Sequence, residues 1–197
     1  MSRIYEIYAE AVSKLAKQID IEKTIVAPVG FGGAAAAELV MYCFAPKHDG
    51  SVFQNTFYAS SKVNSLNEIK IDVIKLADIL FAAHQKGSDI VYLDERAKTG
   101  RLGEGLRKKT RDWEERNSLK INSIYAVLFD PALNADKRGL AIELSNKQRL
   151  EWASEEAYKK FIVKENGGWI YNIEPSEIGK LNHIHDIKME IDSLLLK

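Results

Sequence analysis

Apolar and polar positions divide the chain into alternating helical and extended segments. Between residues 4 and 19 apolar side chains recur every three or four positions, which predicts a helix with one buried face. Short apolar runs at 24–29 and 90–93 predict buried strands. On the same grounds we expect further helices at 34–44, 66–84, 102–117, 154–163 and 176–196, and further strands at 52–60, 121–130, 139–145 and 167–173.

The order of these elements predicts the fold. Strands that alternate with helices are typical of an α/β domain, here a mostly parallel sheet flanked by helices with extra helices at the N- and C-terminal ends. We expect one domain over residues 1–197, with its core at about 20–145 and a C-terminal helical appendage at about 150–197. Because ligands of such sheets bind beyond the carboxyl ends of the strands, the site is expected at that edge.

Composition narrows the class of protein. The 28 basic and 28 acidic residues give a net charge of zero, and the basic run at 96–111 continues into a stretch that carries balancing acids, which argues against nucleic acid as a partner. The single cysteine, Cys43, excludes an internal disulfide and fits a reducing compartment. Neither the first 15 residues nor the apolar stretch 24–46 has the pattern of a signal peptide or membrane span, so we expect a cytoplasmic protein with no membrane partner.

The segment SDIVYLDERAKTGRLGEG, residues 88–105, carries the main candidate chemistry. Asp94 and Glu95 end an apolar strand, and a turn rich in glycine leads into a charged helix. The ordinary explanation is a loop with solvated acids in which Thr99 caps the helix. However, glycine costs a helix roughly 1 kcal/mol relative to alanine. A helix start also offers free amides to a phosphate, so the segment favours a ligand with hydroxyls for the acids and a phosphate for the turn.

A strand that ends in two acids also occurs in P-loop nucleotidases. Those proteins need a G-x-x-x-x-G-K-[ST] loop as well. The chain has one Gly-Lys pair, Gly179-Lys180, and Leu181 follows it where serine or threonine is required. The sequence therefore argues against a P-loop protein.

The pattern from Ile90 to Leu102 resembles the signature of the type I phosphoribosyltransferases: four apolar residues, two acids, three variable residues, then Thr-Gly. The resemblance implies that Asp94 and Glu95 bind the ribose hydroxyls of phosphoribosyl pyrophosphate, and that they reach the cofactor Mg²⁺ through the ligand or through water. Leu102 departs from the family, which commonly has a hydroxyl residue there. The loop that the resemblance places around the 5′-phosphate comprises Arg96, Ala97, Lys98, Thr99, Gly100 and Arg101.

An earlier glycine turn at 29–33 has three interpretations. Its spacing matches a loose dinucleotide fingerprint, but the next predicted strand does not end in the acid that the fingerprint requires. The resemblance implies a loop that binds the pyrophosphate through backbone amides, and close packing of a helix on the sheet explains the glycines equally well. The residues implied for pyrophosphate binding are Val29, Gly30, Phe31, Gly32, Gly33 and, from a separate segment, Lys62.

The resemblance predicts a phosphoribosyltransferase that joins phosphoribose to a nitrogenous base or related acceptor and releases pyrophosphate. The alternative is a non-catalytic protein of the same fold that senses a phosphoribosyl or nucleotide ligand, which the departure at Leu102 favours. Residues 130–137 lie where the family recognises its acceptor, although a surface turn explains them as well. The C-terminal helix is expected to dock on the core, with a homodimer as the alternative.

Overall fold

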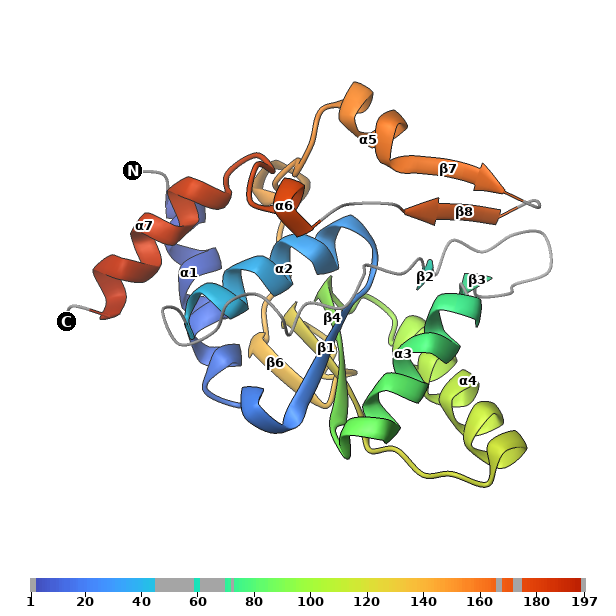
Figure 1. Cartoon of the computed structure of the whole chain (residues 1–197). Coiled ribbons are helices and arrows are strands. Elements are labelled where there is room, and N and C mark those ends of the chain that lie inside the picture. Colours follow the sequence, from blue (N-terminus) through green and yellow to red (C-terminus); the bar gives the residue numbers. More distant parts are fainter. Residues whose placement is uncertain are drawn as a thin grey trace.

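The computed structural model describes residues 3–44, 59–60, 70–71, 73–165, 168–171 and 175–195. Its centre is a four-stranded parallel sheet in the order β1-β4-β5-β6 (Figure 1). The mostly parallel α/β sheet expected from the sequence is thereby confirmed. The four strands are β1 (Thr24–Pro28), β4 (Asp89–Arg96), β5 (Ser123–Phe129) and β6 (Lys137–Leu140).

Helices cover both faces of this sheet (Figure 1). Alternate strand residues enter two separate cores because successive side chains of a strand point to opposite faces. Val91 and Leu93 pack with α1, α2 and α7, whereas Ile90 and Tyr92 pack with α3 and α4. The helices are α1 (Arg3–Ala16), α2 (Gly30–Tyr42), α3 (Val73–Lys86), α4 (Arg101–Asn117) and α7 (Ile184–Leu195).

Strand register places the candidate segments at one edge. Pro28 pairs with Leu93, and the Val29 amide then donates to the Leu93 carbonyl at 2.8 Å. Farther along β4, Arg96 pairs with Phe129 at the end of β5. Since parallel strands end at the same edge, the turn after β1 lies beside the two acids of β4.

Two element boundaries differ from the sequence prediction at this edge. Helix α2 begins at Gly30 and not at Ala34, so four residues predicted as a loop form its first turn. Strand β4 continues through Asp94 and Glu95 to Arg96 and does not end at Leu93. Glycine and acidic residues are typical of loops, so the sequence predicted loops at both positions. In the structure helix α2 includes the glycines from Gly30 onward, and strand β4 includes Asp94 and Glu95.

The C-terminal third departs further from the prediction. After the 3₁₀ turn Asn146–Gln148 and helix α5 (Glu155–Phe161), strands β7 (Ile162–Glu165) and β8 (Gly168–Tyr171) form an antiparallel hairpin apart from the parallel sheet. The predicted C-terminal helix is divided into α6 (Pro175–Ile178) and α7, because His183 adopts a left-handed backbone with a φ of 67°. As expected, α7 docks on the core through Ile184, Ile187 and Ile191.

The short elements complete the described chain. A 3₁₀ turn, Ile21–Lys23, precedes β1, and β2 (Ala59–Ser60) pairs with β3 (Lys70–Ile71). Most of the predicted strand 52–60 lies outside the described residues. The predicted helix 66–84 is corrected at its start, because residues 70–71 form β3 and the helix begins at Val73. None of the helices in the described ranges combines the length and apolarity needed to cross a membrane.

Candidate functional site

The two acids of β4 face opposite sides of the sheet because they are consecutive in a strand. Glu95 points to the α1 side, where the Tyr8 hydroxyl donates a hydrogen bond to Glu95 Oε1. Asp94 points to the α3 and α4 side, where the Tyr125 hydroxyl lies 3.5 Å from Asp94 Oδ2. Each carboxylate therefore has a tyrosine neighbour of its own, and the pair straddles the end of the strand.

The surroundings of Asp94 disfavour the ionised form of its carboxyl group. Its Oδ1 accepts a hydrogen bond from the Glu95 amide at 2.7 Å, while the contact with Tyr125 is at the outer limit of hydrogen bonding. Burial, together with the nearby charge of Glu95, raises the pKa of Asp94 from 3.8 to about 7, although the Glu95 amide and Arg96 oppose the shift. A ligand that donates hydrogen bonds to this carboxylate would relieve the penalty, as expected of a binding residue.

Glycines let the first turn of α2 approach the acids closely. A side chain at Gly32 would place its Cβ 2.9 Å from Glu95 Cβ and 3.0 Å from Glu95 Oε2. At Gly33 the Cβ would lie 2.3 Å from the Leu93 carbonyl oxygen. The close-packing interpretation of this turn is therefore supported for both residues.

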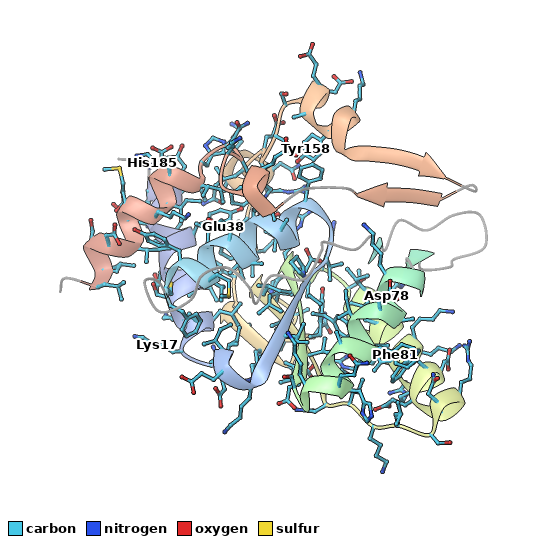
Figure 2. The ribbon with its side chains drawn as sticks, viewed as in Figure 1. Lys17, Glu38, Asp78, Phe81, Tyr158 and His185 are labelled. Atoms are coloured by element: carbon cyan, nitrogen blue, oxygen red, sulfur yellow. The ribbon has the colours of Figure 1, made fainter. Side chains whose placement is uncertain are left out.

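The remaining residues of the predicted pyrophosphate loop have mixed surroundings. The Val29 amide and the Gly33 amide already donate to backbone carbonyls, at 2.8 and 3.2 Å. Phe31 is buried, and its ring lies 4.3 Å from the ring of Tyr158 of α5, which Figure 2 shows reaching toward the start of α2. Gly30 begins the helix with a φ of 65°. Lys62 lies outside the described residues.

The turn between β4 and α4 is open at its centre. The amide of Ala97 donates to Phe129 at 3.0 Å and so continues the sheet, but Lys98 and Thr99 are exposed. Gly100, the N-cap residue of the helix that follows, has a φ of 71°, and no side chain from the part of the chain that the structure describes caps that helix. The first amides of an α-helix lack carbonyl partners within the helix, so an uncapped start is suited to an anion. Arg101, the first residue of α4, is exposed and adds a full positive charge.

The departure at Leu102 has a structural explanation. Leu102 is buried with Leu106 beneath α4, in the core that contains Tyr92 and Tyr125. Beside it, a Cβ on Gly103 would lie 2.5 Å from the Tyr125 ring. The residue at position 102 therefore contributes to packing of α4 on the sheet, so the missing hydroxyl does not by itself argue against a phosphate at the turn.

Two acids after β5 serve the structure. Asp130 is fully buried, accepts hydrogen bonds from the amides of Asn134 and Ala135 at 2.9 and 2.8 Å, and pairs with Arg138 at 3.2 Å. Asp136 accepts a hydrogen bond from the Tyr125 amide and forms an ion pair with Arg107, both at 2.8 Å. A structural role thus accounts for both carboxylates, which fix the chain after β5, but only Asp136 lies at the surface as a surface turn implies.

A cavity that the sequence analysis did not anticipate lies beside Glu95. Its volume is about 670 Å³, and most of its wall comes from the segment between β6 and α5. Trp152 lines it with 2% of its surface exposed, and the indole Nε1 has no hydrogen-bond partner among the described residues. The segment between β6 and α5 contains no recognisable motif, and from the sequence alone Trp152 fits a core position as well as a place in a binding site. The lining residues are Gly32, Glu95, Asn146, Arg149, Leu150, Glu151, Trp152, Ala153, Glu155 and Tyr158.

No protein-family model matches the chain, and comparisons with curated proteins and with solved structures also find no match.

The residues at the edge suit Mg²⁺ that arrives with a ligand. Within the described part of the chain no three histidine, cysteine or acidic side chains gather as a metal site. Mg²⁺ is commonly held by one or two carboxylates together with substrate phosphates and water. Asp94 and Glu95 supply two carboxylates, so the fit is to a metal carried by a phosphorylated ligand.

Proposed function

We propose that the chain binds phosphoribosyl pyrophosphate and transfers its phosphoribosyl group to a nitrogenous acceptor, with release of pyrophosphate. The observation that carries this proposal is the arrangement at the end of β4, where two carboxylates precede an exposed turn and an uncapped helix. Carboxylates accept hydrogen bonds from sugar hydroxyls, and free helix amides bind phosphate.

The ribose would lie over the end of β4. Asp94 and Glu95 would each accept a hydroxyl hydrogen bond, which favours their charged forms. The raised pKa of Asp94 shows that burial outweighs the hydrogen bonds from the Glu95 amide and the Tyr125 hydroxyl. A hydroxyl donor from the ligand would offset the burial that opposes ionisation of Asp94.

The 5′-phosphate would lie at the start of α4. Lys98, Thr99 and Arg101 are exposed around the uncapped amides, so they are free to surround an anion. Thr99 follows Glu95 by only four residues, so the turn and the carboxylates are close along the chain. The pyrophosphate would face the start of α2, where the amides of Gly30 to Gly32 belong to the first turn of that helix.

The cavity beside Glu95 provides a place for the acceptor. Catalysis in this arrangement is mainly positioning of the two reactants and stabilisation of charge at the reacting carbon and the leaving group. Mg²⁺ bound with the pyrophosphate would neutralise the leaving group's charge. The chain's own contribution is to hold the ribose at Asp94 and Glu95 and to place the acceptor along the wall that includes Trp152.

The test is titration of the protein with phosphoribosyl pyrophosphate and Mg²⁺, followed by a screen of nitrogenous bases for pyrophosphate release. Binding with release for one base supports the transferase. Binding without release for any base supports the second candidate, a sensor of phosphoribosyl or nucleotide ligands. An absence of binding contradicts both.

A further inference from the structure

Tyr8 connects the N-terminal helix to the acid pair, although 87 residues separate it from Glu95. The residue is fully buried, and its hydroxyl donates to Glu95 Oε1. Its ring is fixed edge-on between two aromatic neighbours, with centroid distances of 4.8 Å to Phe129 and 5.6 Å to Trp152. Because the Tyr8 ring is held on both sides, its hydroxyl has a fixed position. This hydroxyl therefore fixes the position of the Glu95 carboxylate, which accepts its hydrogen bond.

The hydrogen bond orients the carboxylate of Glu95. Hydrogen bonds to ionised groups are shorter and roughly twice as strong as neutral ones. With Oε1 engaged by Tyr8, the second oxygen is turned toward α2, because Glu95 Oε2 would lie 3.0 Å from a Cβ on Gly32. Gly32 and Glu95 both line the cavity, so one oxygen is fixed by the protein and the other is directed to the site.

The same phenol also fixes the cavity wall. The Tyr8 ring lies 5.6 Å from the ring of Trp152, and Trp152 lines the cavity. Tyr8 therefore packs on the wall through its ring and donates to the acid through its hydroxyl. Burial and the neighbouring carboxylate raise the pKa of Tyr8 far above its ordinary value, so the phenol remains a donor over the physiological range.

We infer that Tyr8 is a positioning residue of the ligand site: through its hydroxyl it directs Glu95 Oε2 toward the ligand and joins α1 and the cavity wall to that carboxylate. The inference rests on the proposed function, since its ligand is phosphoribosyl pyrophosphate. This role of Tyr8 makes helix α1 part of the ligand site. From the sequence, α1 is predicted only as an amphipathic helix that packs on the core.

A double-mutant cycle tests the inference. Tyr8→Phe keeps the ring and removes the hydroxyl, and we expect it to weaken binding of phosphoribosyl pyrophosphate with Mg²⁺ about tenfold, as for other hydrogen bonds to charged groups. In a Glu95→Gln background the same change should have little further effect, because Tyr8 acts through that carboxylate. Binding constants come from calorimetric titration of all four proteins.

Tyr92→Phe is the matched control. Tyr92 is also fully buried and lies on β4, but its hydroxyl is 2.6 Å from Thr110 Oγ1 on the opposite face of the sheet. Loss of this hydroxyl is expected to lower stability by a similar amount and to leave ligand affinity unchanged. A purely structural role for Tyr8 predicts equal binding effects from the two variants, which would overturn the inference.

A second measurement covers the case in which Tyr8→Phe fails to fold. 3-Fluorotyrosine at position 8 keeps the ring and the hydroxyl, and its ¹⁹F signal is expected to shift when ligand is added, whereas the same label at Tyr92 should not respond. Ligand binding by the wild type with no shift at position 8, or additive effects in the cycle, overturns the inference and leaves the proposed function standing. Absence of binding by the wild type overturns both.

Discussion

Two strand-to-helix connections meet at the carboxyl edge of the sheet; glycines are closely packed in both, but the connections differ in how exposed their other residues are. Between β1 and α2, Gly33 lies against the Leu93 carbonyl, so protein atoms fill the connection. Between β4 and α4, Lys98 and Thr99 are exposed and the helix that follows has no side-chain cap. Close packing therefore explains glycines in both connections, and the second differs in presenting exposed residues directly before its helix.

The difference between the two connections also explains the surroundings of Asp94 and Glu95. Close packing of the first connection brings Gly32 beside Glu95, which leaves the acids between a filled turn and an open one. In the proposed function the filled turn supports the carboxylates, and the open turn would contact the phosphate of the ligand. Substitutions in the first should change stability, and substitutions in the second should change binding.

The largest effect is expected from Gly33→Ala. The added Cβ would lie 2.3 Å from a backbone oxygen, and the strand or the helix has to move to admit it. We expect the free energy of unfolding to fall by about 3 kcal/mol, the upper range for an overpacked site. Urea denaturation measures the change. Gly179→Ala is the control, because its Cβ would meet only Glu38 Oε1 at 3.7 Å; equal stability of the two variants would contradict close packing.

The next effect concerns binding at the acids. Asp94→Asn combined with Glu95→Gln removes two charged acceptors, and we expect a loss of affinity for phosphoribosyl pyrophosphate of about 100-fold or more. The variant should stay folded, as circular dichroism would show. Asp89→Asn at the opposite end of β4 is the control and should bind as the wild type does. Unfolding of the double variant would mean that the acids serve the structure.

A smaller effect should appear in stability against pH without ligand. The folded chain keeps the Asp94 proton up to about pH 7, but the unfolded chain releases it near the ordinary value of 3.8. Between these values the folded state binds more protons, so the contribution of Asp94 to stability falls as pH rises. Asp94→Asn removes this loss and should stabilise the protein above pH 7 by about 1 kcal/mol, after allowance for partial solvation.

Urea denaturation of Asp94→Asn and the wild type at pH 5 and pH 8 checks the sign. The stabilisation by the variant should be larger at pH 8 than at pH 5. A variant that is equally destabilised at both values would show that the carboxylate contributes a structural hydrogen bond rather than an unfavourable buried charge.

The smallest effect is expected from Thr99→Ala, which distinguishes the open turn from an ordinary capped helix. Thr99 is exposed and makes no capping hydrogen bond. We expect affinity for phosphoribosyl pyrophosphate to fall about fivefold, less than for a buried hydrogen bond to a charged group, because Thr99 is exposed to water. Stability should change by less than about 0.5 kcal/mol. A loss of stability near 1 kcal/mol with unchanged affinity would restore the capping explanation.

The sequence predicts the sheet well because its central strands are continuous apolar runs buried on both faces, as at 24–29 and 90–93. It also locates the acids, since their position after an apolar run is a local signal. The start of α2 was missed because the role of Gly33 depends on register with Leu93, a contact between segments 60 residues apart. Tyr8 and the cavity wall were missed for the same reason.

The most direct test of the account is a crystal structure of the protein with phosphoribosyl pyrophosphate and Mg²⁺. The account predicts ribose hydroxyls within hydrogen-bonding distance of Asp94 and Glu95, and the 5′-phosphate at the amides that begin α4, beside Thr99. A ligand whose phosphate lies elsewhere while both carboxylates keep only their tyrosine partners would contradict it.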